Sequence, residues 1–380
     1  LEGSLISFMD IKEERLDSVY TLCKRYAEES GIKLRLEKTL NLEESIKDAD
    51  FVINTALSAG HNQLREGWDI AYKYGYRFGG SFHIVHDEAF WINFYQFRLF
   101  EDVAETILKL SPSAWYIQVA NPVLAGITYL SRKYKDLKLV GICHGFDGIY
   151  HIAHNLGLEK DSISFQIPGV NHFIFLTHFT YKGEDAYPLL DKWIEEKAKD
   201  YWQNCGFSDQ MGPKPVDIYK KFGLYPIGDT ATPGGGTWPW WYHIDDETEK
   251  MWKEDPKTWY EGYFVRGKER IEEMSKIAKD NSIKVTEVYP PKTSNEIIIP
   301  LLESIAFDIQ RVFQVNIPNT GSFIEGIPED FEVEIPALVS KKGIQGIKVD
   351  SLPKSILALI LRERVAPVEM EIEAYENGNK

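Results

Sequence analysis

The amino-acid sequence predicts an α/β fold, in which a Rossmann-type dinucleotide-binding domain over residues 1–147 is followed by an α+β domain over residues 148–380. In the first part, short apolar stretches alternate with segments of helical periodicity, which is typical of a parallel sheet with crossover helices. In the second part, strand-like stretches of a mixed sheet accompany long helical segments. We expect the boundary near residues 145–150.

Hydrophobic periodicity predicts the individual elements in order. In the first part, short apolar runs predict strands over residues 4–9, 33–36, 51–55, 115–119 and 137–142. Helical spacing predicts helices over residues 11–30, from residue 42, and over residues 94–109 and 123–134. In the second part we expect strands over residues 164–167, 173–181 and 284–288, a hairpin of 331–338 with 346–349, and helices over 187–201, 260–279 and 352–362.

Composition excludes several classes of protein. The 380 residues include 43 Lys and Arg against 58 Asp and Glu, a net charge of −15. A nucleic acid or an anionic membrane surface is therefore not an expected partner. Hydrophobic residues make up 43%, as in a folded domain, and no apolar run approaches the ~18 residues that span a bilayer. Three cysteines form no disulfide framework and favour a reducing cytoplasm.

An acid ends the first expected strand. A carboxylate at this place can accept hydrogen bonds from both ribose hydroxyls of NAD, so we expect Asp10 to bind the cofactor. It would repel the 2′-phosphate of NADP, although Lys12 and Arg15 leave NADP open. The alternative is an N-cap for the following helix. No Gly-rich turn precedes Asp10, and we expect that turn in a segment before residue 1.

Asparagines follow two later strands. Asn54 and Asn121 lie where ligands bind in a doubly wound sheet, beyond the carboxyl ends of the strands. Because Asn and Pro are also common in turns, the simpler interpretation of either residue alone is turn formation.

Two short segments carry candidate metal ligands. Cys143 and His144 follow the strand over residues 137–142, and Asn171 and His172 follow later. Thiolate and imidazole both bind first-row divalent metals, and two protein ligands would leave positions open for substrate. By spacing alone, Cys143 is more simply interpreted as a small core residue.

Three further groups are weaker. Asp229 precedes a glycine run at residues 234–236 and the tryptophans Trp238, Trp240 and Trp241, which could form a mobile, aromatic lid or a surface turn with an interface patch. His151 and His154 fit a solvated helix face. His83, His86, Asp87 and Glu88 form an acid–histidine cluster that fits no metal-binding pattern by itself.

Taken together, these segments resemble glycoside hydrolase family 4, whose members are NAD-dependent glycosidases. The resemblance rests on the motifs FMD (8–10), ADFVINTA (49–56), VANPV (119–123), GICHG (141–145), GVNHF (169–173), GEDAYPLLDKW (183–193) and YPIGDT (225–230). They follow the family order up to about residue 364. The absent Gly-rich turn is the main departure.

The resemblance implies a fold similar to lactate and malate dehydrogenases, together with NAD and a divalent metal, usually Mn²⁺. It implies that Cys143 and His172 are the metal ligands and that Asn121, Asp87 and Asn171 bind substrate. Cofactor contacts fall to Asp10, Arg15, Asn54 and Asn121. Family members are commonly dimers or tetramers, so we expect a homo-oligomer.

The Cys-His-Gly motif is similar to the branch that acts on α-linked uronic acids, which predicts an α-glucuronide or α-galacturonide as substrate. Oxidation at C3 would acidify C2, and Asp229 is the expected C2 base, with Tyr225 and Tyr242 as alternatives and His144 as the acid. An Arg found near this Asp in an α-glucosidase relative is Thr232 here. The alternatives are a neutral-sugar α-glucosidase or α-galactosidase, a 2-hydroxy-acid dehydrogenase, and a non-catalytic NAD-binding or sugar-sensing protein.

Overall fold

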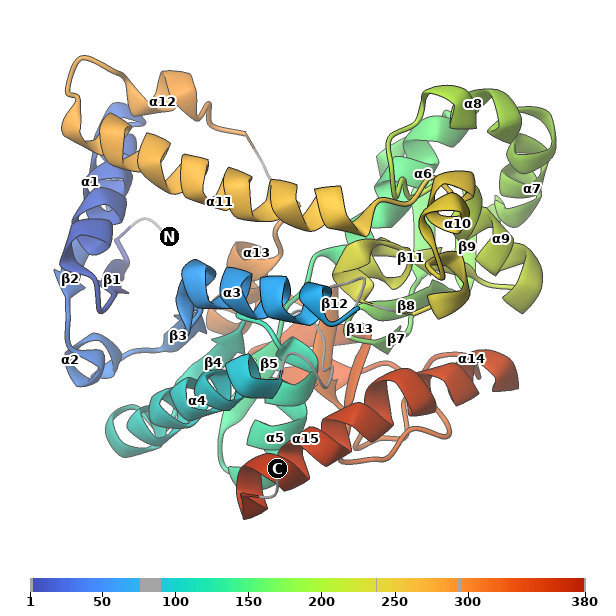
Figure 1. Cartoon of the computed structure of the whole chain (residues 1–380). Helices are drawn as coiled ribbons and strands as arrows, with labels where there is room; N and C mark the ends of the chain where they lie inside the picture. The colour runs from blue at the N-terminus through green and yellow to red at the C-terminus, as the bar shows by residue number, and fades with distance from the viewer. Residues whose placement is uncertain (1–2, 76–89, 237, 293–294, 379–380) are drawn as a thin grey trace.

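The computed structural model describes residues 3–75, 90–236, 238–292 and 295–378 (Figure 1). The first part of the chain contains strands β1 (Leu5–Met9), β2 (Arg35–Thr39), β3 (Phe51–Asn54), β4 (Trp115–Gln118) and β5 (Lys138–Gly141). Its helices are α1 (Glu13–Glu29), α2 (Leu42–Ile46), α3 (Gly60–Lys73), α4 (Phe90–Leu110) and α5 (Val123–Lys133). The strands and helices expected in this part are thus confirmed to within a few residues, and α3 is an additional helix.

The N-terminal strands form two sheets, where the alternating pattern predicts one. β1 and β2 pair in parallel in a sheet of their own, whereas β3, β4 and β5 pair in parallel within a nine-stranded sheet. The parallel α/β character of this part is confirmed.

The second part begins with η2 (Gly145–Asp147) and α6 (Gly148–Leu156). The strands that follow are β6 (Ile163–Gln166), β7 (Gly169–Val170), β8 (Phe173–Leu176), β9 (His178–Tyr181), β10 (Glu184–Asp185) and β11 (Tyr225–Ile227). The helices are α7 (Tyr187–Glu196), α8 (Ala198–Asn204), α9 (Pro213–Phe222), α10 (Asp246–Met251), α11 (Pro256–Lys279), α12 (Val285–Val288) and α13 (Ile298–Phe307).

Four expectations for this part need correction. The second strand of the expected hairpin lies over residues 343–346, and not over 346–349. Residues 285–288 form helix α12, which packs on α1, and not a strand. The expected strand over 173–181 is divided, because β8 pairs with β7 and β11 while β9 turns to pair with β6 and β10. The expected helix over 187–201 is divided into α7 and α8 at Lys197. A short run rich in β-branched residues, such as 284–288, is compatible with a strand or a helix, so packing against the rest of the chain decides between the two.

The C-terminal segment returns to the first part of the chain. Strand β12 (Arg311–Pro318) pairs antiparallel with β5 and with β13 (Glu332–Ser340), and β13 pairs with β7 and β14 (Gly343–Gly346). The main sheet runs β11-β8-β7-β13-β12-β5-β4-β3. Helix α14 (Lys354–Ile360), a π-helical turn at Leu361–Val365 and α15 (Ala366–Asn377) follow; α15 packs on α5 (Figure 1).

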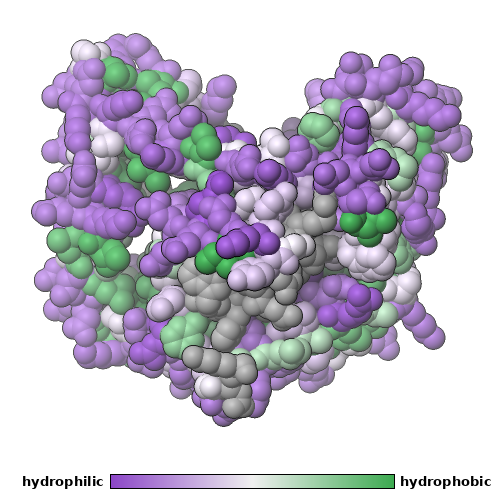
Figure 2. Space-filling model, viewed as in Figure 1, coloured by the Kyte–Doolittle hydropathy of each residue, from purple (hydrophilic) through white to green (hydrophobic). Residues whose placement is uncertain are grey.

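One large apolar core lies around this sheet and a second lies under α6, α7 and β9. In Figure 1, helix α11 crosses from the second part of the chain to α1, and the two are in contact. Figure 2 shows a notch at the top of this face between the lobe with α1 and α12 and the lobe with α7 and α8, and both lobes are mainly polar. No helix in the described part of the chain combines the length and apolar character needed to cross a membrane.

Candidate active site

Four chain segments meet at the end of β5. Cys143 follows β5, and Asn171 and His172 form the tight turn between β7 and β8. Asp229 lies in the short 3-10 turn η4 (Gly228–Ala231), and β13 passes beneath with Glu334. Neighbouring strands of one sheet bring together residues that are far apart in the sequence.

Gly228 lets η2 and η4 approach each other. A Cβ atom on Gly228 would lie 2.3 Å from the carbonyl oxygen of Gly145, and Gly228 has a left-handed backbone with φ of 59°. Only glycine accepts this conformation and this contact without strain. The Cys-His-Gly segment and the Asp229 segment therefore touch backbone to backbone.

Cys143 is a free, partly buried thiol. Burial raises its pKa well above the ordinary value, and the carboxylates of Glu334 and Asp229 add to the shift. Hydrogen bonds from the Gly145 amide, 3.4 Å from the sulfur, and from the Asn171 side chain oppose it. In the protein alone the sulfur thus carries a proton, and a metal ion would displace that proton on binding.

His172 lies beside Asp229. Its Nδ1 is 3.4 Å from Oδ2 of Asp229 and 3.4 Å from the carbonyl oxygen of Gly234. Burial lowers the pKa of His172, although Asp229 acts in the opposite direction. The imidazole is therefore neutral near pH 7, which is the form that binds metals. Its φ of 60° is rare for a residue with a side chain and favours a functional constraint at this turn.

The Asp229 side chain is 33% exposed and is held from one side. Thr232 Oγ1 donates a hydrogen bond to Oδ1 at 2.7 Å. Gly234 and Gly235 pack against the same residue: a Cβ on Gly234 would lie 2.6 Å from Oδ1, and one on Gly235 would lie 1.8 Å from the Asp229 carbonyl oxygen. The glycine run at 234–236 thus makes room for Asp229.

Asn171 connects the turn to two buried carboxyl groups of β13. Its backbone amide donates to Glu332 Oε2 and its Nδ2 donates to Glu334 Oε2, both at 3.2 Å. All three side chains are fully buried. Burial raises the pKa of Glu332 well above the ordinary value and that of Glu334 to about 8. Because Asn171 is enclosed in this way, its contacts support the turn, and they do not favour the substrate contact expected for it.

A buried guanidinium closes the far side. Arg364, in the π-helical turn, lies over the Phe173 ring at 4.6 Å and donates to the Gly235 carbonyl oxygen at 2.7 Å. Burial lowers its pKa to about 9. It also contributes to the lowered pKa of His172. A helical segment 129 residues farther along the chain than Gly235 thus supports the glycine turn next to Asp229.

The other side chains expected to be catalytic are those of His144 and Tyr225, with Tyr242 as an alternative. His144 is 69% exposed, with Nδ1 3.2 Å from Glu296 Oε1. Tyr225 is fully buried in the second core, donates its hydroxyl to the Gln210 carbonyl oxygen at 3.0 Å, and has a pKa raised well above the ordinary value by burial. Tyr242 is also buried and donates to Asp217 at 2.6 Å. These contacts disfavour either tyrosine as a base.

The expected cofactor contacts lie at or just after the carboxyl ends of the first strands, apart from Arg15 on α1. Asp10 follows β1 and forms an ion pair with Arg15, with N–O distances of 2.5 and 2.7 Å, so these two residues engage each other. Asn54 is buried, and its amide contacts Tyr116 and the backbone of Ala56. This is the arrangement of a turn residue.

The remaining residues singled out from the sequence have different outcomes in the structure. Asn121 precedes a cis proline at the end of β4, where Oδ1 accepts from Val123 N at 3.4 Å. Asp87, with His83, His86 and Glu88, lies outside the described residues. The tryptophans of the expected lid lie in different environments. Trp238 is buried against Phe173 and donates to Thr230, so it is a core residue and not part of a lid, whereas Trp240 is 56% exposed.

Sequence reasoning missed Glu332, Glu334 and Arg364. One signal was available for the two glutamates: they alternate with apolar residues in the run FEVEIPALV, which otherwise reads as a buried strand. A charged residue at a core position of such a strand is rare and often functional. Arg364 gave no comparable signal, because its helix carries charges on both sides.

The donor set fits a divalent metal. Cys143 offers a thiol, His172 a neutral imidazole, and Asp229 a carboxylate beside them. Among the residues that the structure describes, no three His, Cys, Asp or Glu side chains are grouped closely enough to hold a metal by themselves. Two protein donors with a nearby acid match the requirement of a catalytic metal for open positions.

Two curated relatives match along most of the chain. An α-glucosidase of Erwinia rhapontici is 25% identical over 430 residues, which span 100% of this chain and 85% of the relative. An α-galacturonidase of Thermoanaerobacterium saccharolyticum is 26% identical over 341 residues, which span 85% of this chain and 71% of the relative.

Solved structures agree on the fold. A 6-phospho-α-glucosidase from gut microorganisms, in complex with NAD and Mn²⁺, superposes with a TM-score of 0.78 at 21% identity, covering 98% of this chain and 84% of that one. A 6-phospho-β-glucosidase of Thermotoga maritima, with NAD and glucose-6-phosphate, has a TM-score of 0.74 at 20% identity, covering 98% and 82%. Malate dehydrogenase of Plasmodium falciparum has a TM-score of 0.53 at 13% identity, covering 98% and 90%, which confirms the expected dehydrogenase-like fold.

The family assignment follows from models of both halves. The model described as family 4 glycosyl hydrolase matches residues 1–159, and that of the family 4 glycosyl hydrolase C-terminal domain matches residues 167–380. Together they cover the strands that carry Cys143, His172 and Asp229. The chain therefore belongs to glycosyl hydrolase family 4.

Proposed function

We propose that this glycosidase hydrolyses α-linked uronides, an α-glucuronide or an α-galacturonide, with NAD and a divalent metal such as Mn²⁺. The observation that carries the proposal is the meeting of Cys143, His172 and Asp229 at the end of β5. The solved family members that bind NAD and Mn²⁺ support the two cofactors, and the α-galacturonidase relative supports the sugar class.

Cys143 and His172 would hold the metal. The residues expected to contact NAD lie in the N-terminal part of the chain; they are Asp10, Arg15, Asn54 and Asn121. When bound, NAD⁺ would take and return a hydride at C3 of the sugar, and the metal would act as a Lewis acid toward the neighbouring oxygen. The chain itself must supply the proton transfers.

Asp229 is the proposed base for the C2 proton. One oxygen accepts a hydrogen bond from Thr232 and the other faces His172, so the carboxylate is oriented. Its side chain is one-third exposed. A carboxylate suffices here because oxidation at C3 makes the C2 proton acidic. Thr232 and the glycine run at 234–236 fix its direction.

His144 is the proposed acid for the leaving group. Its imidazole is exposed, and Nδ1 lies 3.2 Å from Glu296 Oε1, a contact that orients the ring. As the C1–O bond breaks, the electron pair goes to the glycosidic oxygen, and His144 gives that oxygen a proton. Water then adds at C1 and gives a proton to His144, and Asp229 returns a proton to C2.

The thiol sets a condition on the setting of the enzyme. Oxidation of Cys143 would remove a metal ligand, so the proposal requires reducing conditions and favours a cytoplasmic enzyme. The second candidate substrate is a neutral α-glucoside, which is favoured by the α-glucosidase relative that spans the whole chain.

The test is cleavage of an aryl α-glucuronide, an aryl α-galacturonide and an aryl α-glucoside in D₂O, each with and without NAD⁺, Mn²⁺ and thiol. We expect uronide cleavage that needs all three additives and places deuterium at C2 of the released sugar. Turnover of the glucoside alone would replace the uronide by the neutral sugar. Net NADH formation on a 2-hydroxy acid without glycoside cleavage would overturn the proposal.

A matched pair of variants tests the base. Asp229→Asn should abolish C2 deuteration, whereas Asp102→Asn, an exposed acid on α4, should leave it unchanged. If Asp229→Asn still exchanges C2 at the wild-type rate, another group is the base.

A further inference from the structure

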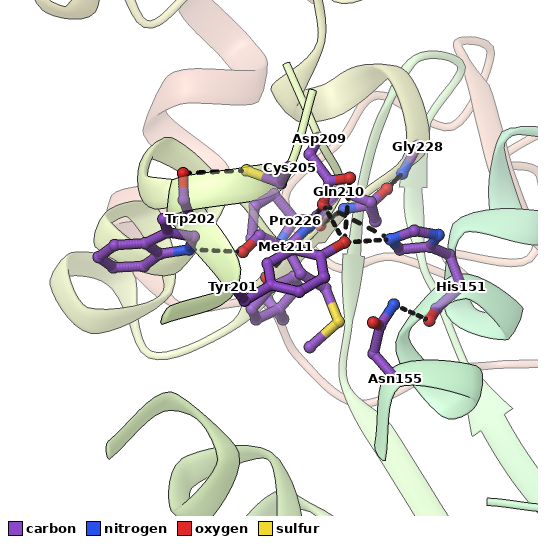
Figure 3. A network of polar contacts seen from close by, with 11 residues as sticks. His151, Asn155, Tyr201, Trp202, Cys205, Asp209, Gln210, Met211, Pro226 and Gly228 are labelled. Carbon is purple, nitrogen blue, oxygen red and sulfur yellow. Dashed lines mark hydrogen bonds and ion pairs between the residues drawn. The ribbon is translucent and has the colours of Figure 1, made fainter. Parts of the chain in front are cut away.

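A hydrogen-bond network behind the Asp229 turn is centred on Gln210 (Figure 3). Its side chain bridges two backbone groups: Nε2 donates to the Pro226 carbonyl oxygen at 2.9 Å, and Oε1 accepts from the Gly228 amide at 2.6 Å. These groups flank Ile227 and directly precede Asp229. One side chain thus holds the backbone at the point where β11 ends and η4 begins.

Gln210 is itself anchored by its neighbours. The Asp209 carboxylate accepts from the Met211 amide at 2.8 Å and from the Tyr201 hydroxyl at 3.1 Å. His151, on α6, lies with Nε2 3.2 Å from the same hydroxyl and 3.5 Å from Asp209. Figure 3 shows these three side chains converging from α6, α8 and the loop before α9. Residues 209–211 are thereby fixed to two helices.

The fit around the Gln210 amide is tight. A Cβ atom on Gly148, at the start of α6, would lie 2.5 Å from Gln210 Oε1 and 3.0 Å from the Gly228 amide nitrogen. Gly228 in turn packs on Gly145. The Gln210 carboxamide therefore occupies a space that the surrounding backbone leaves for it, beside the segment that carries Cys143.

We propose that Gln210 is a positioning residue for the reaction: it fixes the Gly228 peptide and thereby the direction of the Asp229 carboxylate toward His172. The inference rests on the proposed function, in which Asp229 is the C2 base. It does not make Gln210 a catalytic residue, because the hydrogen bonds of its side chain go to the backbone of Pro226 and Gly228.

The chemistry of the bridge explains why glutamine occupies this place. The Pro226 carbonyl needs a donor and the Gly228 amide needs an acceptor, and a carboxamide provides both at once. An ionised glutamate keeps the acceptor and loses the donor. Methionine has a similar length and provides neither, so the two substitutions remove the bridge in steps.

The experiment compares Gln210→Met and Gln210→Glu with Gln203→Met, an exposed glutamine on α8 that serves as the control. Two quantities are measured: the rate of C2 deuteration of substrate, and amide hydrogen exchange of the peptide over residues 225–232. For Gln210→Met we expect C2 deuteration about 10- to 100-fold slower, because small misplacements of a reacting group have effects of this size. KM should change little.

Amide exchange over residues 225–232 should accelerate in Gln210→Met, with an intermediate effect in Gln210→Glu and none in Gln203→Met. Thermal unfolding shows whether each variant is folded. A folded Gln210→Met with wild-type C2 deuteration would overturn the inference, and so would unchanged amide exchange of the segment.

The two proposals fail in different ways. If the wild-type enzyme shows no NAD- and metal-dependent C2 deuteration, the proposed function is wrong, and the hydrogen exchange of residues 225–232 still decides whether Gln210 holds this segment. If the wild type deuterates C2 and the Gln210 variants do so equally fast, only the positioning role is wrong.

Discussion

The imidazole of His172 and the carboxylate of Asp229 lie side by side, with 3.4 Å between Nδ1 and Oδ2. They differ in exposure: His172 is almost fully buried, whereas the Asp229 side chain is one-third exposed. A buried neutral imidazole beside a reachable carboxylate separates two tasks. The first can hold a cation, and the second can exchange protons with a ligand bound next to it.

Removal of the thiol tests the metal site. Cys143→Ser should abolish metal-dependent turnover and leave NAD binding largely intact, because serine is a poor ligand in its protonated form. Cys205→Ser is the matched control, since that sulfur is in a different part of the chain near Trp202. Metal content and NAD titration would be measured together. Near wild-type turnover by Cys143→Ser would exclude the assigned ligand.

The contact between the Gly145 and Gly228 segments predicts that alanine substitutions at these two glycines have unequal effects on stability. Gly228→Ala places a Cβ 2.3 Å from the Gly145 carbonyl oxygen at a left-handed φ, and should lower the free energy of unfolding by about 1–3 kcal/mol or more. Gly145→Ala meets nothing closer than 3.7 Å and should change it by less than about 1 kcal/mol. Urea unfolding of both variants is the measurement, and equal effects would contradict the packing.

A buried acid between α4 and α15 predicts pH-dependent stability. Asn93 donates to Glu371 Oε1 at 2.7 Å, and burial raises the Glu371 pKa to about 8. The folded protein therefore binds this proton more tightly than the unfolded chain, whose ordinary value is 4.5. The stability from this group is complete below pH 4.5 and is lost as the pH rises toward 8, at up to about 1.4 kcal/mol per pH unit.

Glu371→Gln should remove this loss, since a neutral amide keeps a partner for Asn93 without a buried charge. We expect the variant to match the wild type near pH 4.5 and to be more stable at pH 8. Glu373→Gln, exposed on the same helix, is the control. The idea is wrong if the difference in unfolding free energy between Glu371→Gln and wild type is the same at both pH values.

The Asp10–Arg15 pair predicts the choice of cofactor. If Asp10 binds the ribose hydroxyls, Asp10→Asn should weaken NAD binding about 10- to 100-fold, the range for hydrogen bonds to a charged group. The affinity for NADP should fall much less, because in Asp10→Asn the 2′-phosphate of NADP no longer meets a carboxylate. Asp17→Asn, which removes only a surface pair with Lys38, is the control in the same fluorescence titration. An unchanged Kd for NAD would assign Asp10 to its contact with Arg15 alone.

Much of the fold was predictable from local patterns. The apolar runs at 51–54 and 115–118 gave strands β3 and β4, and the helical spacing at 260–279 lies within α11. Helix α3 was not predicted, although Leu64, Trp68 and Ala71 recur with helical spacing and are buried. The run at 284–288 was mispredicted as a strand because five residues carry too little periodicity to distinguish a strand from a helix.

The sequence by itself determined the segments that make up the candidate site. Cys143, His172 and Asp229 each follow a short apolar run, and the ends of strands are where side chains become available for ligands. Their roles toward substrate stay predictions. What only the tertiary structure decided is which other groups lie around them: Glu334 beneath Asn171, Arg364 over Phe173, and Gln210 behind Gly228. Tyr225, adjacent in sequence to the Asp229 turn, faces the core instead.

The physical reason is the range of the forces involved. Periodicity records which face of an element is apolar, and that is a local property of ten or so residues. The pKa of a buried acid and the support of a turn depend on packing between strands and helices that are far apart along the chain, and a spacing in the sequence contains no record of those neighbours.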